Sequence, residues 1–135
     1  MADKKVNGIK ILVIDDDAQI CELVKDGLSQ WGYKVLTAKA GNIGIWIADC
    51  KWHKPNLIIL DLMMQGIDGF EVLKRLRQDK LTAYTPVIIM TGKTDYASQL
   101  KAEGLYCDDY IVKPVSLDVL KSRVEQVLIK RGIIE

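Results

Sequence analysis

The sequence predicts an α/β protein: a doubly wound, five-stranded parallel sheet with five helices and the strand order 2-1-3-4-5. Three observations lead to this prediction. Segments typical of strands and of helices alternate five times along the 135 residues. The strand segments are nearly continuous apolar runs, as expected for strands that helices cover on both faces. A closed eight-fold α/β barrel needs about 250 residues, so an open sheet is the architecture that this chain length allows.

In the first half of the chain, β-branched runs predict strands at 10–15, 33–38 and 56–61. Apolar residues at helical spacing predict a helix over 18–31, which Gly32 ends. A second helix is predicted over 42–52, although its β-branched residues have low helix propensity. This second helix has more apolar residues than one buried face requires, so either it lies unusually deep or it exposes a patch to a partner. The residues concerned are Ile43, Ile45, Trp46, Ile47 and Trp52.

In the second half, similar runs predict strands at 86–91 and 109–113. Helices are predicted from about 68 to 81, over roughly 95–103, and over 116–131. The first of these places Phe70, Leu73, Leu76 and Leu81 on its apolar side. Right-handed crossovers restrict the topology of such an alternating chain and favour the flavodoxin-like arrangement. We expect residues 1–135 to form one domain, with its core between about residues 9 and 131.

The composition is balanced. Lys and Arg number 19 and Asp and Glu 18, a formal net charge of +1, so we expect neither nucleic acid nor a membrane surface as a direct partner. No apolar run approaches the roughly 20 residues of a membrane span. The first ten residues lack the apolar core of a signal peptide. The three cysteines are far apart and are expected to be reduced thiols, so we expect a cytoplasmic location.

Polar residues stand where four of the predicted strands end, at what should be one edge of the sheet. They are Asp15, Asp16 and Asp17 after the first strand, Asp61 after the third, Thr91 at the end of the fourth and Lys113 at the end of the fifth. Neighbouring carboxylates repel one another by about 1–4 kcal/mol per pair near a protein surface, and Mg²⁺ relieves such repulsion. Acids, a hydroxyl and an ammonium around a metal suit phosphoryl transfer to an aspartate.

Each of these residues alone has a plainer explanation. We expect Asp17 to cap the helix that follows it rather than to bind metal. Asp15 and Asp16 also suit a cap or a turn, and Asp61 alone suits the start of a turn. The position of these groups at different strand ends is what favours a functional site.

Four motifs extend this interpretation: "ILVIDDD", "PNLIILDLMMQGIDGFEVL", "PVIIMTG" and "DDYIVKP". Together they make residues from about 10 to 130 resemble the receiver domain of bacterial two-component response regulators, which has a CheY-like fold. The resemblance implies that Asp15, Asp16 and Asp61 hold Mg²⁺, with the backbone carbonyl of Met63 as a further ligand. It implies that Asp61 accepts a phosphoryl group from a histidine kinase or a histidine phosphotransfer protein.

The resemblance also gives roles to residues of the last two strands. Thr91 and Lys113 would bind the phosphoryl oxygens, and Tyr110 would be the aromatic switch residue. Thr91 would move toward the phosphoryl group and Tyr110 would fill the space that it leaves, which would change the surface offered to a downstream protein partner. The Lys113–Pro114 bond is expected to be cis. Such a domain is a signalling switch rather than an enzyme, although it assists its own phosphorylation and dephosphorylation, and some such domains form homodimers.

Two departures from the family pattern are visible. Gln65 stands where proline is usual, and "GLYCDDY" before the last strand is two residues longer than the usual "GADDY". Within these 135 residues we expect no output domain after the last predicted helix. It leaves open whether the domain stands alone or belongs to a longer regulator or hybrid kinase. A phosphate-independent interaction module on the same fold is the main alternative. An aspartate-dependent phosphatase would usually have a second acid at Met63, and a flavodoxin would lack the repelling acids.

Overall fold

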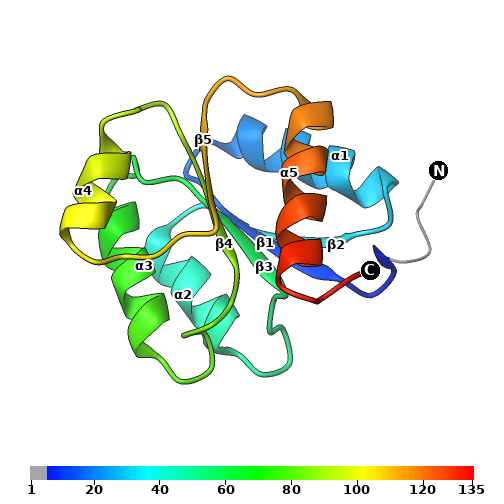
Figure 1. The fold of residues 1–135 in the computed structure, drawn as a ribbon, viewed down its shortest axis with the longest axis horizontal. Helices are drawn as coiled ribbons and strands as arrows, with labels where there is room; N and C mark the ends of the chain where they lie inside the picture. The colour runs from blue at the N-terminus through cyan, green and yellow to red at the C-terminus, as the bar shows by residue number, and fades with distance from the viewer. Residues whose placement is uncertain (1–5) are drawn as a thin grey trace.

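The computed structural model describes residues 6–135, which form a five-stranded parallel sheet between two layers of helices (Figure 1). The strand order is β2-β1-β3-β4-β5 and every neighbouring pair is parallel, so the predicted doubly wound, flavodoxin-like topology is confirmed. The strands are β1 (Lys10–Ile14), β2 (Lys34–Ala38), β3 (Leu57–Leu60), β4 (Val87–Thr91) and β5 (Asp109–Val112). The helices are α1 (Ala18–Gln30), α2 (Gly41–Asp49), α3 (Gly69–Gln78), α4 (Tyr96–Ala102) and α5 (Leu117–Lys130).

The sheet separates two apolar cores. Helices α1 and α5 cover one face, and α2, α3 and α4 cover the other (Figure 1). Successive side chains of a strand point to opposite faces, so Ile11 and Val13 of β1 lie in the first core while Leu12 and Ile14 lie in the second. The strands are therefore buried on both sides, which explains why they read as unbroken apolar runs.

Helices α2 and α3 end about three residues earlier than predicted. Cys50 takes an extended conformation after α2. After α3, Asp79 is also extended, and its carboxylate accepts a hydrogen bond from the N–H of Leu81 at 2.9 Å. This local side-chain bond competes with another helical turn. Leu81 therefore lies outside the helix with 45% of its surface exposed.

Three of the five apolar residues in and after α2 are exposed. Ile45 and Ile47 pack partly against the second core. Ile43 and Trp46 are exposed, and Trp52, which lies beyond the end of the helix, has 77% of its surface exposed. Of the two interpretations that the sequence left open, these exposures exclude the deeply buried helix and leave apolar side chains on the surface.

The longer segment before β5 is fastened by a buried carboxylate. Asp108 accepts a hydrogen bond from the N–H of Val87 at 2.9 Å and pairs with the guanidinium of Arg131. Arg77 lies 3.9 Å from the same carboxylate and donates to the carbonyl of Tyr106 at 3.2 Å. These contacts join α3, β4 and α5 around the loop, so the two extra residues are held against the body of the domain. No helix within residues 6–135 has the length and hydropathy to span a bilayer.

Gly69, the first residue of α3, provides a test of how tightly this helix abuts β3. A Cβ atom at residue 69 would lie 2.4 Å from both the carbonyl oxygen of Asp61 and the Cα of Leu62. Because both are backbone atoms, we expect Gly69→Ala to lower the free energy of unfolding by about 1–3 kcal/mol. Urea denaturation measures this value.

The control for that experiment is Gly92→Ala. Nothing lies within 4 Å of a Cβ at residue 92, so this change should stay within about 0.5 kcal/mol of the wild type. Equal stabilities of the two variants would show that α3 can move away from β3 without cost.

Candidate functional site

The carboxyl ends of four strands bring the polar residues together as predicted. Ile14 pairs with Leu60 in the sheet, and the N–H of Asp61 donates to the carbonyl of Ile14 at 3.0 Å. The residues that follow β1 and β3 therefore lie side by side at the carboxyl-terminal edge of the sheet. On the far side of β3, β4 ends at Thr91, and the N–H of Lys113 donates to the Thr91 carbonyl at 2.8 Å. Parallel pairing thus places all of these groups along one edge.

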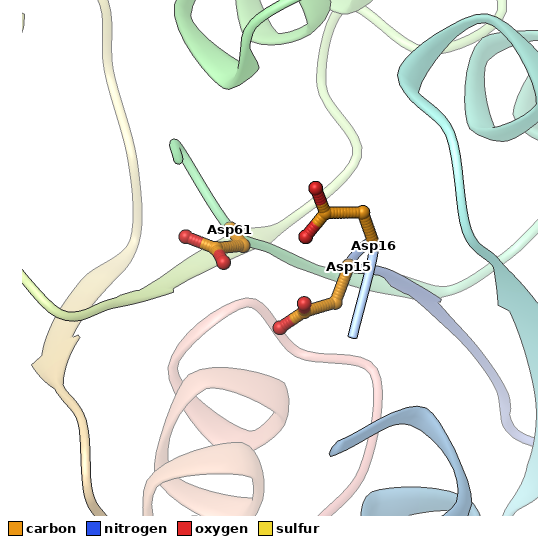
Figure 2. Close-up of side chains that lie close together, drawn as sticks. All are labelled: Asp15, Asp16 and Asp61. Carbon is orange, nitrogen blue, oxygen red and sulfur yellow. The ribbon is translucent and has the colours of Figure 1, made fainter. Parts of the chain in front are cut away.

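Three carboxylates form a cluster at this edge. Asp15, Asp16 and Asp61 each offer an oxygen, and these oxygens all lie within 4.8 Å of one another. Figure 2 shows the first two side chains at the end of β1 and the third at the end of β3. Asp15 and Asp61 are only 1% and 6% exposed, whereas Asp16 is exposed to solvent. Burying two negatively charged carboxylates is unfavourable unless nearby positive charges or hydrogen-bond donors stabilise them.

Lys113 supplies part of this stabilisation. Its Nζ lies 2.7 Å from Oδ2 of Asp15 and 3.0 Å from Oδ2 of Asp61. Burial by itself lowers the pKa of Lys113, but the hydrogen bonds to these two carboxylates and their negative charges together outweigh it, and the net shift is upward. The pKa of Asp15 is also raised, chiefly by burial, despite its bond to Lys113. One ammonium therefore does not fully stabilise the carboxylate of Asp15.

Each carboxylate of the cluster also accepts one backbone hydrogen bond from a loop. The donors are the N–H of Asp17 to Asp15 at 2.9 Å, of Met63 to Asp61 at 2.9 Å and of Gln65 to Asp16 at 3.1 Å. The side chain of Asp17 itself accepts from the first turn of α1, so it is a helix cap, as predicted. Hard oxygen donors with one flanking ammonium fit a divalent cation such as Mg²⁺.

The two predicted switch residues differ in their surroundings. Thr91 is completely buried, and its Oγ1 has no hydrogen-bond partner among the described residues. Tyr110 is partly buried, and its hydroxyl donates to the carbonyl of Lys93 in the loop between β4 and α4. Burial is the main reason that the pKa of Tyr110 is raised. The Lys113–Pro114 bond is cis, as expected.

Two contacts of the site were not foreseen from the sequence. The thiol of Cys21, on α1, donates to the backbone carbonyl of Asp15 at 3.2 Å. The other is the bond from the Gln65 amide to Asp16. The only sequence signal for the second contact is that residue 65 is not proline, since proline has no N–H to donate.

Comparison with known proteins gives the family of this chain. The family model described as "Response regulator receiver domain" matches residues 11–125, and the chain belongs to this family. Among solved structures, the chemotaxis protein CheY4 of Vibrio cholerae is 28% identical with a TM-score of 0.81, covering 89% of this chain and 98% of that one. A CheY-like receiver domain protein from Methanospirillum hungatei has a TM-score of 0.83 at 25% identity, covering 92% and 96%. The predicted CheY-like fold is thus confirmed.

The relatives found by sequence are longer proteins. The alkaline phosphatase synthesis transcriptional regulatory protein PhoP of Bacillus subtilis is 39% identical over 119 residues, which are 88% of this chain and 48% of PhoP. The phosphate regulon transcriptional regulatory protein PhoB of Pseudomonas aeruginosa is 36% identical over 126 residues, which are 93% of this chain and 54% of PhoB. The chain spans about half the length of these response regulators.

These relatives correct one expectation. The balanced charge led us to expect no direct nucleic acid partner, but the relatives are transcriptional regulators. RpaA of Synechocystis, 38% identical over 119 residues, is named as DNA-binding. The expectation was wrong because the net charge of these 135 residues carries no information about the half of each relative that does not align with them.

The raised pKa of Asp15 predicts a pH dependence of the metal-free domain. The pKa of Asp15 is higher in the folded protein than its ordinary value of 3.8. The contribution of such a group to stability is therefore fully present below pH 3.8. It is lost as the pH rises through the pKa of the folded state. Asp15→Asn removes the charge and keeps an acceptor for the N–H of Asp17. We expect this variant to lose less stability than the wild type as the pH rises from acidic to neutral values.

Urea denaturation in EDTA at pH 4.5 and pH 7.5 measures this effect. The wild type should lose more stability than Asp15→Asn between the two values. Asp26→Asn, a change at an exposed position of α1, is the control and should follow the wild type. A wild type whose stability rises across this range by as much as that of Asp15→Asn would contradict the assignment.

Proposed function

We propose that this receiver domain is a phosphoacceptor switch. The Asp61 carboxylate takes a phosphoryl group from the phosphohistidine of a histidine kinase or a histidine phosphotransfer protein. The observation that carries the proposal is the joint arrangement at the sheet edge. Asp61 is hydrogen-bonded to Lys113 within a cluster of acids, and the next strand ends in a buried threonine whose hydroxyl has no partner among residues 6–135.

The chemistry is an in-line displacement. An oxygen of Asp61 forms a bond to phosphorus, the bond from phosphorus to the histidine nitrogen breaks, and the imidazole keeps the electron pair and takes up a proton. When bound, Mg²⁺ would neutralise charge on the phosphoryl oxygens. Asp15, Asp16, Asp61 and the backbone carbonyl of Met63 would hold it. Lys113 would then exchange its bond with Asp61 for one with a phosphoryl oxygen.

The unpartnered hydroxyl of Thr91 indicates which way the end of β4 would move on phosphorylation. A phosphoryl oxygen near Asp61 would be an acceptor for Oγ1, and this new bond would draw the end of β4 toward the site. Tyr110, whose hydroxyl is bound to the carbonyl of Lys93 in the loop after β4, would respond to that movement. The surface of α4, β5 and α5 would change for a downstream protein partner.

The energy of such a switch requires several contacts. Shifting an equilibrium from 1:99 to 99:1 takes about 5.5 kcal/mol, and one hydrogen bond to a charged group contributes about 1.5–3 kcal/mol. Thr91, Lys113 and the metal together suffice, whereas any one of them does not. Because the relatives are transcriptional regulators, we propose that the output of this switch is the control of gene expression. A cytoplasmic location remains a prediction.

The test of phosphate acceptance is intact mass after incubation with acetyl phosphate and Mg²⁺. We expect a single phosphoryl adduct on the wild type that is lost without Mg²⁺ and in Asp61→Asn. Asp26→Asn should be modified like the wild type. If acetyl phosphate gives no adduct, phosphorylated histidine phosphotransfer proteins are tried as donors. Failure of every donor on folded, Mg²⁺-saturated protein would refute the proposal and favour a phosphate-independent interaction module.

Thr91→Val separates the two roles of this residue. It replaces a buried, unpartnered hydroxyl with a methyl group, so we expect the unphosphorylated domain to be as stable as the wild type or more stable by about 1 kcal/mol. Phosphoryl uptake should be slowed about 10- to 100-fold, because one charge-assisted bond is lost in the transition state. Urea denaturation and the rate of adduct formation measure the two effects. A large loss of stability would show that the hydroxyl already has a structural role.

A further inference from the structure

The loop between β3 and α3 makes one contact that the proposed function does not use. The backbone N–H of Gln65 donates to Oδ2 of Asp16 at 3.1 Å, and so joins two loops that are 49 residues apart in the sequence. Proline is the one residue type that could not make this bond. The contact therefore depends on the departure from the usual proline at this position of the motif.

Asp16 is the least constrained member of the acid cluster. Asp15 and Asp61 are buried, and each is held both by a backbone N–H and by the ammonium of Lys113. Asp16 is exposed to solvent, and within residues 6–135 the amide of Gln65 is the one hydrogen-bond donor to its carboxylate. An exposed aspartate without such a bond would sample several rotamers, and binding a cation would then have to order it.

We propose that Gln65, through its main-chain N–H, is a positioning residue that orients the carboxylate of Asp16 toward Asp15 and Asp61 before a divalent cation binds. The amide occupies only Oδ2, and a carboxylate has acceptor sites on both oxygens, so Oδ1 stays available to the cation or to its bound water. The amide thus lowers the ordering cost of cation binding, which is the usual benefit of preorganisation. The inference rests on the proposed function in taking Mg²⁺ as the cation.

A pair of variants at one position isolates the amide. Gln65→Pro removes the N–H, whereas Gln65→Ala keeps the N–H and removes the side chain. We expect Gln65→Pro to weaken Mg²⁺ binding about 3- to 10-fold, as for the loss of one hydrogen bond, and Gln65→Ala to stay within about twofold of the wild type. Isothermal titration of the full chain with Mg²⁺ alone, without a phosphodonor, measures these affinities.

A second measurement does not depend on the proline variant or on metal. In the metal-free protein, Asp16→Ala should accelerate hydrogen exchange of the Gln65 amide severalfold, because that amide loses its acceptor. The Met63 amide, which is bonded to Asp61 in the same loop, is the internal reference and should exchange at an unchanged rate. This readout distinguishes a bond through Asp16 from a general loosening of the loop.

The outcomes are separable. Unchanged Mg²⁺ affinity of folded Gln65→Pro would overturn the positioning role and leave the proposed function intact. Equal weakening in Gln65→Ala, or an unchanged exchange rate of the Gln65 amide in Asp16→Ala, would also overturn it. A wild-type chain that binds no Mg²⁺ would overturn the proposed function and this inference together.

Discussion

The ammonium of Lys113 lies between two buried carboxylates, and the arrangement of the site depends on this contact. Asp15 and Asp61 directly follow two neighbouring strands, and without a cation between them their burial would oppose folding. Lys113 reaches them from the end of β5, two strands away from β3. Strand β4 lies between β3 and β5 in the sheet and ends at the buried Thr91. The strand order thus determines which polar residues meet at this edge, and the chemistry of the site depends on that order.

The compensation by Lys113 is incomplete, and this incompleteness suits a switch. One ammonium contacts two carboxylates of a cluster of three, and the pKa of Asp15 is raised even so. A site with no net negative charge would attract a cation only weakly, and its contacts would change little on phosphorylation. A site without Lys113 would carry uncompensated buried charge. The observed state lies between these limits. In the proposed mechanism, a bound cation would share the carboxylates with Lys113, and a phosphoryl oxygen would replace Asp61 as a partner of Lys113.

Much of this architecture could be predicted from the sequence, because the features concerned depend on residue type and order. Apolar runs marked the buried strands, and the acids, Thr91 and Lys113 followed directly at their ends. The end of α3 was missed because it depends on a local hydrogen bond from the Leu81 amide to Asp79. The Gln65 amide was missed because a backbone donor leaves almost no trace in the residue type. The surface near α2 required the observed exposure of Trp46 and Trp52, since composition suited a buried helix equally well.

The sheet also separates two apolar cores that lie on its opposite faces. Alternate residues of each central strand serve different cores, and the acid cluster lies at the strand ends, between the two cores. Substitutions in the helices on one face can therefore create a surface for a new partner. The core on the opposite face still holds the strand ends in register. In such a fold the recognition surfaces can diversify during evolution while the acid cluster at the strand ends keeps the same chemistry.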